Sequence, residues 1–421
     1  MDRYVRPMKD SGIEWIGKIP QNWLTSKIKF YLYRREPRNP GNMPVLSVYR
    51  DYGVVPKDSR NDNHNVTSYD TSNYKYVTIG DLVINKMKAW QGSLAVSAYT
   101  GIVSPAYYVY HFKNTSLNRK YFHYLIRNCY KDEFKRLSTG IRDGQWDLQS
   151  YDFENTTILI PPLKEQQLII EFLDKKCGKI DKLLSQINDE IDTLKKYQHS
   201  LIIRVVTKGL DSNVPTKDSG IEWIGTMPEK WNVVKGKFIL TLLDRPTKKD
   251  DEVITCFRDG QVTLRKNRRT DGFTISTKEI GYQGVDVGDL VVHAMDGFAG
   301  AIGISDSRGK ASPVLNVMDS SENKNYLKYY LRCCAYLGVF NALAKGIRVR
   351  TADTRWSTLA NLKFPLPTKN EQKDISDYLD QKCAEIRALI NEKNRQLDLL
   401  TKYKNSLIFE YVTGKKQVPQ I

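Results

Sequence analysis

The sequence predicts an α+β fold with two similar globular domains at opposite ends of an antiparallel two-helix coiled coil, with pseudo-two-fold symmetry and a circular module order. The first observation is a repeated block: residues 9–23 (KDSGIEWIGKIPQNW) recur as residues 217–231 (KDSGIEWIGTMPEKW), with eleven of fifteen positions identical. The second is a pair of long heptad patterns, one in each half of the 421-residue chain. Together they indicate a duplicated module that exceeds the period of solenoid repeats, which is usually about 20–50 residues.

Further segments align between the two halves. Residues 80–83 and 288–291 both read GDLV, and the dipeptide Glu-Gln occurs at residues 165–166 and again at 371–372. Between the repeated block and the heptad pattern, each half has strand-like runs rich in Val, Tyr and Thr, which are typical of a β-containing domain. Each copy therefore contains a block, a globular domain, a proline-rich hinge and a long helix.

The heptad pattern is the clearest element. Apolar residues alternate at spacings of four and three, which is the seam of a coiled coil. About 44 residues at about 1.5 Å rise give a helix of roughly 65 Å, and each seam is expected to bury the other. The short connection after the first helix favours an antiparallel pair. The predicted seam residues are Leu173, Cys177, Ile180, Leu184, Ile187, Ile191, Leu194, Leu379, Cys383, Ile386, Ile390, Leu397, Leu400 and Leu407.

The module boundaries follow from these patterns. Because the block at 217–231 directly follows the first helix, the block at 9–23 is expected beside the end of the second helix, with Ile16 and Ile224 packing a domain base beside Trp15 and Trp223. The predicted modules are the repeat block 1–23, recognition domain 24–160, spacer helix 161–209, linker and block 210–231, recognition domain 232–364, spacer helix 365–416 and tail 417–421.

Composition indicates the kind of partner. The formal net charge is +17, and each long helical segment (164–209 and 369–416) carries only +2, so most of the excess lies in the globular parts. Such a charge favours a polyanionic partner, with general solubility as the alternative. The sequence has no long apolar run or signal peptide, and its six cysteines form no Cys-x-x-Cys pair, so a cytoplasmic location is expected.

The regions expected to contact a partner differ between the halves. Residues 34–70 and 242–280 share almost nothing, and residues 86–91 (KMKAWQ) stand opposite residues 294–299 (AMDGFA). Arg and Lys can donate to guanine, and Gln can pair with adenine, although most basic residues at such surfaces contact phosphates. The candidate DNA-binding residues are Lys86, Lys88, Trp90, Gln91, Arg142, Gln145, Trp146, Arg265, Lys266, Arg268, Arg269, Arg348, Arg350 and Arg355.

Catalytic signatures are missing from the sequence. It contains no phosphate-binding GxxxxGK[ST] loop and no Rossmann glycine fingerprint, and its only Pro-Pro pair, at 161–162, lacks the flanking residues of an amino-methyltransferase motif. The five histidines are scattered without triad or metal-ligand spacing. We therefore assign no catalytic or metal-binding residue and interpret the chain as a binding protein.

The repeated GIEWIG block, the Glu-Gln pairs and the heptad helices after two unlike domains together resemble the specificity subunits of type I restriction–modification systems. The resemblance covers nearly the whole chain. It implies a non-catalytic subunit whose two target recognition domains each read one half of a bipartite, asymmetric site in double-stranded DNA, with the helices as a spacer. It also implies two modification subunits that methylate adenine using S-adenosylmethionine, and restriction subunits that use ATP and Mg²⁺.

Other interpretations remain open from the residues alone. A stand-alone DNA-binding regulator of a split operator would also need two reading domains and a spacer. A duplicated enzyme is disfavoured by the missing motifs, and a coiled-coil scaffold without nucleic acid is disfavoured by the basic globular parts.

Overall fold

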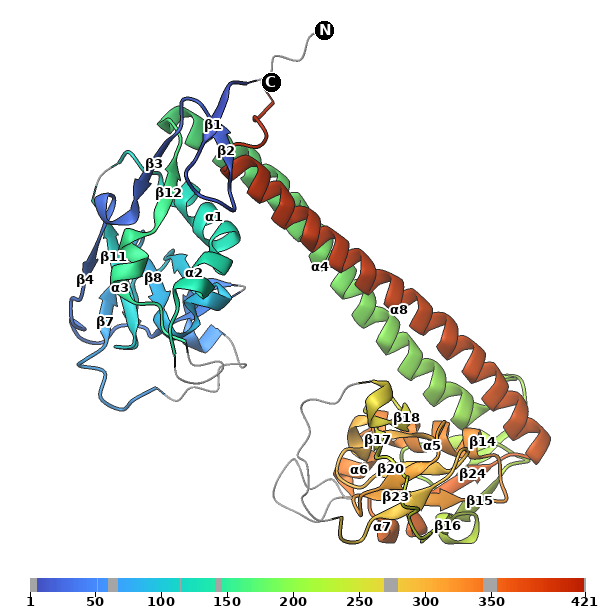
Figure 1. Ribbon diagram of the computed structural model, residues 1–421. Coiled ribbons are helices and arrows are strands. Elements are labelled where there is room, and N and C mark those ends of the chain that lie inside the picture. Colours follow the sequence, from blue (N-terminus) through green and yellow to red (C-terminus); the bar gives the residue numbers. More distant parts are fainter. Residues whose placement is uncertain are drawn as a thin grey trace. The chain divides into compact units, whose positions relative to one another are not determined.

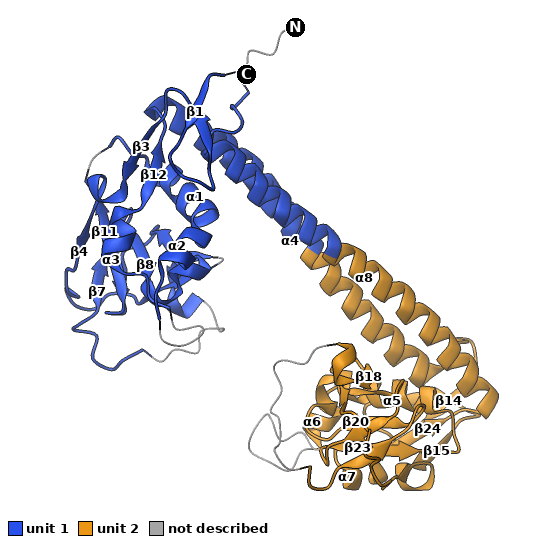
Figure 2. Ribbon diagram, viewed as in Figure 1, with its two compact units in different colours: residues 1–187, 395–421 blue, residues 188–394 orange. Residues whose placement is uncertain are grey.

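The computed structural model describes residues 6–50, 52–59, 67–113, 115–140, 146–268, 279–343 and 354–419. The chain forms two compact units: residues 1–187 with 395–421, and residues 188–394 (Figure 2). Unit 1 therefore contains the first half of one long helix and the second half of the other, and unit 2 contains the complementary halves. Each unit contains segments of both long helices because the chain reverses direction between them.

The globular part of unit 1 is built on a four-stranded antiparallel sheet of order β4-β11-β8-β9 (Figure 1). Smaller antiparallel pairs surround it: β1 with β2, β3 with β12, β5 with β6 and β7 with β10. The strands are β1 (Met8–Asp10), β2 (Lys18–Pro20), β3 (Leu24–Lys27), β4 (Leu32–Arg35), β5 (Leu46–Tyr49), β6 (Gly53–Pro56), β7 (Lys75–Val77), β8 (Leu82–Asn85), β9 (Leu94–Val96), β10 (Gly101–Val103), β11 (Tyr107–Phe112) and β12 (Thr157–Ile160).

Unit 2 repeats this topology strand for strand. Its central sheet has the order β16-β23-β20-β21, and β13 pairs with β14, β15 with β24, β17 with β18 and β19 with β22. The strands are β13 (Thr216–Asp218), β14 (Thr226–Pro228), β15 (Asn232–Lys235), β16 (Thr241–Leu242), β17 (Ile254–Cys256), β18 (Val262–Leu264), β19 (Gln283–Val285), β20 (Leu290–His293), β21 (Ile302–Ile304), β22 (Gly309–Ala311), β23 (Leu315–Asp319) and β24 (Lys363–Leu366).

Short helices complete each globular part. The first begins at an asparagine cap in both copies: the Asn118 side chain accepts from the Lys120 backbone N–H at 2.9 Å, and the Asn323 side chain accepts from that of Tyr326 at 3.0 Å. The helices are α1 (Arg119–Cys129), α2 (Lys131–Leu137) and α3 (Ser150–Asn155) in unit 1, and α5 (Lys324–Tyr336), α6 (Val339–Ala342) and α7 (Trp356–Asn361) in unit 2. The 3₁₀ turns are η1 (Ile28–Phe30), η2 (Lys57–Ser59), η3 (Lys86–Gln91), η4 (Gly236–Phe238), η5 (Arg265–Asn267) and η6 (Gly297–Ala299).

The two long helices are α4 (Leu163–Lys208) and α8 (Lys369–Val412), and they run antiparallel within each unit (Figure 1). In unit 1, Lys404 of α8 donates to Asp181 of α4 at 2.5 Å, and in unit 2, Lys393 pairs with Glu190 at 2.6 Å. These two lysines interrupt the heptad pattern of α8 and are used for ion pairs across the helix pair. α8 begins four residues after the predicted hinge at 365 because residues 363–366 form β24.

The predicted seam residues lie between the paired helices or against the adjoining cores. Leu173, Cys177, Ile180 and Leu407 are buried in the core of unit 1, and Leu184 and Leu400 pack against it. The corresponding residues of unit 2 behave in the same way. Leu379, Cys383 and Ile386 are buried there, Ile191 is buried on α4, and Leu194 and Ile390 pack against the core. Ile187 and Leu397, which belong to unit 1, are half-buried.

The repeated Glu-Gln pair joins each globular domain to its long helix. The buried Gln166 accepts from the Asn118 backbone N–H at 2.7 Å and donates to the carbonyls of Ser116 at 3.0 Å and Pro161 at 2.8 Å. Gln372 repeats the bonds to Asn323 and to a proline carbonyl. A buried amide with all these partners satisfied fixes the start of the domain helix against the start of the long helix.

The repeated block packs against the end of a long helix in each unit. Lys415, just beyond α8, donates to the carbonyls of Ile16 and Lys18, and Lys208, at the end of α4, donates to those of Ile224 and Thr226. Ile16 is buried, whereas the partly exposed Trp15 packs edge-on against Tyr130 with ring centroids 4.9 Å apart. The α+β class, the antiparallel helix pair and the circular order of modules are therefore confirmed.

Candidate nucleic-acid interface

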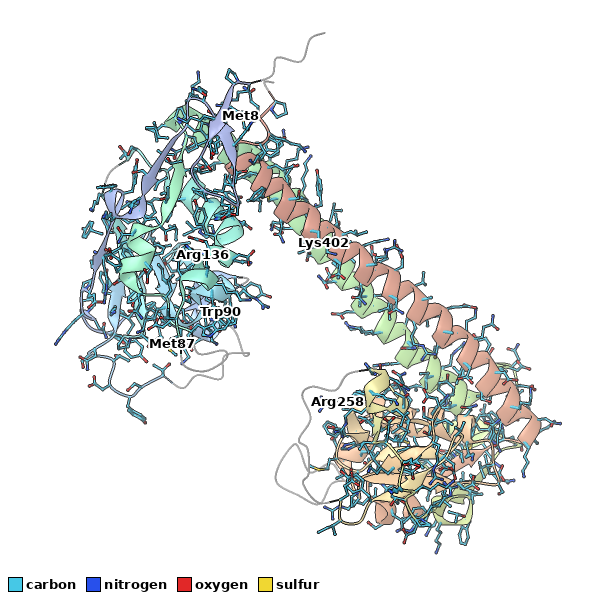
Figure 3. All side chains as sticks on the ribbon, viewed as in Figure 1. Met8, Met87, Trp90, Arg136, Arg258 and Lys402 are labelled. Atoms are coloured by element: carbon cyan, nitrogen blue, oxygen red, sulfur yellow. The ribbon has the colours of Figure 1, made fainter. Side chains whose placement is uncertain are left out.

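In unit 1, two tryptophans and two lysines from separate segments form the tryptophan cluster, made of Lys86, Trp90, Lys135, Trp146 and Asp147. The Trp90 and Trp146 ring centroids lie 4.9 Å apart, and the Lys135 ammonium lies 5.8 Å from the Trp146 ring (Figure 3 labels Trp90). Lys86 donates to Asp147 at 2.9 Å, and this bond raises the pKa of Lys86, so its ammonium stays charged. Indole faces beside ammonium groups can contact bases and phosphates together.

The other predicted residues of unit 1 do not belong to the tryptophan cluster. Lys88 is exposed and Gln91 is half-buried, both on η3. Arg142 and Gln145 lie outside the described residues. Sequence reasoning missed Lys135 and the neighbouring Arg136, because charges on a short amphipathic helix resemble an ordinary solvated face. They line a cleft of about 340 Å³ formed by Asp132, Lys135, Arg136, Ser138 and Trp146.

In unit 2, a cleft of about 770 Å³ lies beside the β17–β18 hairpin. We call it the arginine cleft, because three of its lining residues are arginines. Its lining residues are Ile254, Thr255, Cys256, Phe257, Arg258, Asp259, Arg265, Arg268, His293, Asp296, Ser312 and Leu315.

Ion pairs hold the arginine cleft in shape. Arg268 donates to Asp259 at 2.9 Å, and its guanidinium lies 4.2 Å from the centroid of the Phe257 ring. Burial opposes ionisation of Asp259, yet hydrogen bonds from Arg268 and a backbone N–H lower its pKa, so the carboxylate is charged. Arg258 donates to Asp296 at 2.8 Å. The cleft therefore presents guanidinium groups already fixed in direction, the arrangement that bidentate recognition of guanine or phosphate requires.

The predicted residues of unit 2 divide into four sets. Arg265 and Arg268 line the arginine cleft, and the Arg265 Nε atom lies 3.4 Å from the Thr255 hydroxyl. Lys266, next to them on η5, forms an exposed ion pair with Glu252. Arg355 precedes α7 and does not belong to the cleft lining. Three others lie outside the described residues: Arg269, Arg348 and Arg350.

The expectation that residues 34–70 and 242–280 share almost nothing is wrong for one hairpin. Strands β5–β6 and β17–β18 are equivalent, and their turns read Tyr-Arg-Asp-Tyr-Gly at residues 49–53 and Phe-Arg-Asp-Gly at residues 257–260. The pairs Leu46–Pro56 and Ile254–Leu264 are both 208 residues apart, so the two hairpins have equal length and the match is confined to a few residues at the turn of a long, divergent segment. An ungapped comparison at the 208-residue spacing of the blocks aligns Arg50 with Arg258.

The shared GDLV segments belong to the framework. Asp81 is fully buried and accepts from Arg35, from His111 at 2.9 Å and from the backbone N–H of Thr78 at 2.7 Å. Burial opposes the shift, but these bonds lower the pKa of Asp81. Asp289 likewise accepts from Arg245 and from a backbone N–H. These carboxylates close a turn before β8 and β20, so their repetition reflects folding.

A metal ion or a lipid bilayer would require a different kind of site. Within the described part of the chain, no three His, Cys, Asp or Glu side chains are grouped as they would be around a metal ion. None of the described helices combines the length and the apolar character needed to cross a lipid bilayer.

The chain therefore contains two copies of one framework, and each copy has a different polar cluster on its surface. Residues 26–193 match the family model for the type I restriction modification DNA specificity domain. The chain is 23% identical over 430 residues to the MjaVIII specificity subunit of Methanocaldococcus jannaschii, covering 96% of this chain and 95% of that protein. It is also 23% identical over 442 residues to the putative MjaX specificity subunit of the same organism, covering 96% of each.

A solved chain from work on complex assembly and conformational transition of a type I restriction–modification system has the same fold. It superposes with a TM-score of 0.65 at 13% identity, covering 94% of this chain and 99% of that chain. Residues 26–193 thus resemble the type I restriction modification DNA specificity domain, and nearly the whole chain is similar to type I restriction enzyme specificity subunits.

Proposed function

We propose that the chain is the DNA-reading subunit of a type I restriction–modification complex, and that each globular domain reads one half of a bipartite, asymmetric site in double-stranded DNA. The observation that carries the proposal is the contrast between framework and surface. Strand order, helix caps and junction hydrogen bonds repeat, whereas the tryptophan cluster combines indoles with lysines and the arginine cleft presents guanidinium groups. Two copies of one scaffold with different surfaces suit two different half-sites.

The chemistry of the two surfaces supports DNA as the ligand. The arginine cleft offers rigid guanidinium groups, which pair bidentately with guanine O6 and N7 in the major groove. The tryptophan cluster offers lysines next to two indoles in contact, and its smaller number of hydrogen-bond donors predicts a different base preference. The basic excess of the globular parts supplies the sequence-independent attraction to phosphates.

The paired helices are proposed to set the number of unread base pairs between the half-sites. A protein that reads two half-sites on one face of a duplex needs them about one helical turn, roughly 34–36 Å, apart or somewhat more. The helices suit a spacer because their ends are held at both junctions by buried hydrogen bonds and their middle by cross-helix ion pairs.

The partners are proposed from the family. Two modification subunits would methylate adenine with S-adenosylmethionine, and restriction subunits would use ATP and Mg²⁺, so this chain directs the chemistry of others. The repeated blocks and the exposed faces of α4 and α8 are the proposed docking surfaces, because they are the parts whose structure is duplicated.

Methylation-sensitive sequencing of the host genome, with and without the gene, tests the proposal. We expect an adenine mark at one split motif to disappear on deletion and to return on complementation. A stand-alone regulator of a split operator would leave the methylation pattern unchanged and alter transcription near its site. An unchanged methylome in a host whose modification subunits are active would overturn the proposal.

A further inference from the structure

The hairpin turn that both domains share is supported in each by an arginine of the first domain helix, which donates to a carbonyl of the turn. In unit 1, Arg127 of α1 donates to the Arg50 carbonyl at 2.5 Å, and in unit 2, Arg332 of α5 donates to the Asp259 carbonyl at 2.5 Å. Arg127 and Arg332 occupy equivalent positions, nine residues after the asparagine caps. The turn is therefore supported by a helix in both domains, although the surrounding surfaces differ.

The glycine in each turn is required by this support. Gly53 has φ 74° and Gly260 has φ 91°, backbone conformations that other residues rarely adopt. A Cβ on Gly53 would lie 2.6 Å from the Arg127 guanidinium, and one on Gly260 would overlap the Arg332 guanidinium. A larger residue in place of either glycine would therefore disturb both the turn conformation and the position of the supporting arginine.

The supported turn presents an arginine to solvent in both domains. Arg50 and Arg258 are both exposed. The Arg258 side chain is 67% exposed, and its ion pair is with the partly exposed Asp296 (Figure 3 labels Arg258). An exposed ion pair contributes little free energy, so a phosphate can replace the carboxylate at small cost.

We propose that Arg50 and Arg258 each bind a DNA phosphate, making the same contact in both half-sites, and that Arg127 and Arg332 position them. This inference rests on the proposed function. The two domains differ wherever they would read bases, so a feature kept in both is expected to contact what both half-sites share, which is the sugar–phosphate backbone.

The test uses the full chain assembled with the modification subunits of its host and two unrelated mixed-sequence DNA duplexes. Affinity is measured by fluorescence anisotropy between about 50 and 200 mM salt. We expect Arg258→Ala to weaken binding to both duplexes by a similar factor of about tenfold, since a charge-assisted hydrogen bond is lost. The slope of log affinity against log salt should become shallower by about 1, and Arg50→Ala should behave in the same way.

Two controls separate charge from position. Arg258→Lys keeps the charge, so we expect it to keep the salt slope. Lys235→Ala removes one exposed charge from β15, which does not line the arginine cleft, and should leave the slope unchanged. A loss confined to one duplex would make Arg258 a base-reading residue, and an unchanged slope would remove it from the interface. If the unmodified assembly bound neither duplex, the proposed function itself would fail.

The positioning role has its own readout. Arg332→Ala should weaken binding to both duplexes, and the Arg258→Ala/Arg332→Ala double variant should bind no more weakly than Arg258→Ala alone. Gly260→Ala displaces the same guanidinium and should reproduce the Arg332→Ala effect. Additive losses in the double variant would show that Arg332 acts independently and would overturn the positioning role.

Discussion

Glutamate-to-glutamine substitutions at the two junctions should have unequal effects on stability. Glu165, in the first turn of α4, accepts from the Trp23 indole at 2.9 Å and from both terminal nitrogens of Arg6. Glu371, in the first turn of α8, accepts from the Trp231 indole at 3.0 Å. The position equivalent to Arg6 holds Val214, 208 residues later. The duplicated chain thus contains one junction with an ion pair and a matched one without it.

The expected difference follows from what glutamine keeps. The amide oxygen of glutamine still accepts a hydrogen bond from the indole. The loss that both variants share is therefore the favourable charge at a helix N-terminus, about 0.3–1 kcal/mol. Glu165→Gln also removes the charge opposite Arg6. The two side chains are only 19% and 20% exposed, so this pair is screened less than a surface pair. Hydrogen bonds to charged groups contribute about 1.5–3 kcal/mol, so we expect Glu165→Gln to cost about 1–2 kcal/mol more than Glu371→Gln.

Native-state hydrogen exchange measures this locally. Glu165→Gln should accelerate exchange in residues 9–23, and Glu371→Gln should accelerate exchange in residues 217–231. The first acceleration should be about tenfold larger than the second, because 1.4 kcal/mol is a factor of ten in an equilibrium constant. Arg6→Met added to Glu165→Gln should change little further. Equal acceleration at the two blocks would refute the assignment of the extra stability to the Arg6 pair.

Three further outcomes are expected. Deleting one heptad from both α4 and α8 should change the gap of the methylated motif or abolish methylation, and an unaltered motif in the genome sequence would exclude the spacer role. Trp146→Ala should change base preference in one half of the motif and leave the other half as it was, which the same sequencing reads directly. Lowering the pH from about 6.5 to 4 should destabilise unit 1 by about 2–3 kcal/mol through His123, because burial lowers its folded-state pKa to about 4 and only the unfolded chain takes up the proton. His123→Asn should flatten that dependence in urea unfolding.

The fold was predictable because the repeat and the heptads are local signals. A block that occurs twice marks the modules, and alternating spacings of four and three mark helices that must cover each other. The order of strands was not predictable in this way. β3 pairs with β12 and β15 with β24 across more than a hundred residues of sequence, and no periodicity records such pairing.

The sequence predicts the residue types of the candidate site better than it predicts which of those residues lie together in the fold. Trp90 and Trp146 were chosen separately, each next to basic residues, and the fold places their rings in contact. Arg355 is predicted for the same chemistry, yet it precedes α7 and is absent from the cleft lining. Arg258 is missing from the prediction because the shared turn is only a few residues within a long segment that otherwise differs between the halves.

The distribution of shared and unlike residues explains how one scaffold can carry two surfaces. The repeated residues Gln166 and Gln372, and the aspartates Asp81 and Asp289, satisfy buried backbone groups that every copy of this fold contains. Those demands are the same whatever the surface binds, so these positions are constrained by folding in both halves. The surface clusters satisfy no such demand, because their ion pairs join side chains and an exposed pair such as Arg258–Asp296 contributes little to stability. Substitutions can therefore accumulate there without unfolding the domain, and the surfaces can diverge in what they bind while the junctions keep them on equivalent supports.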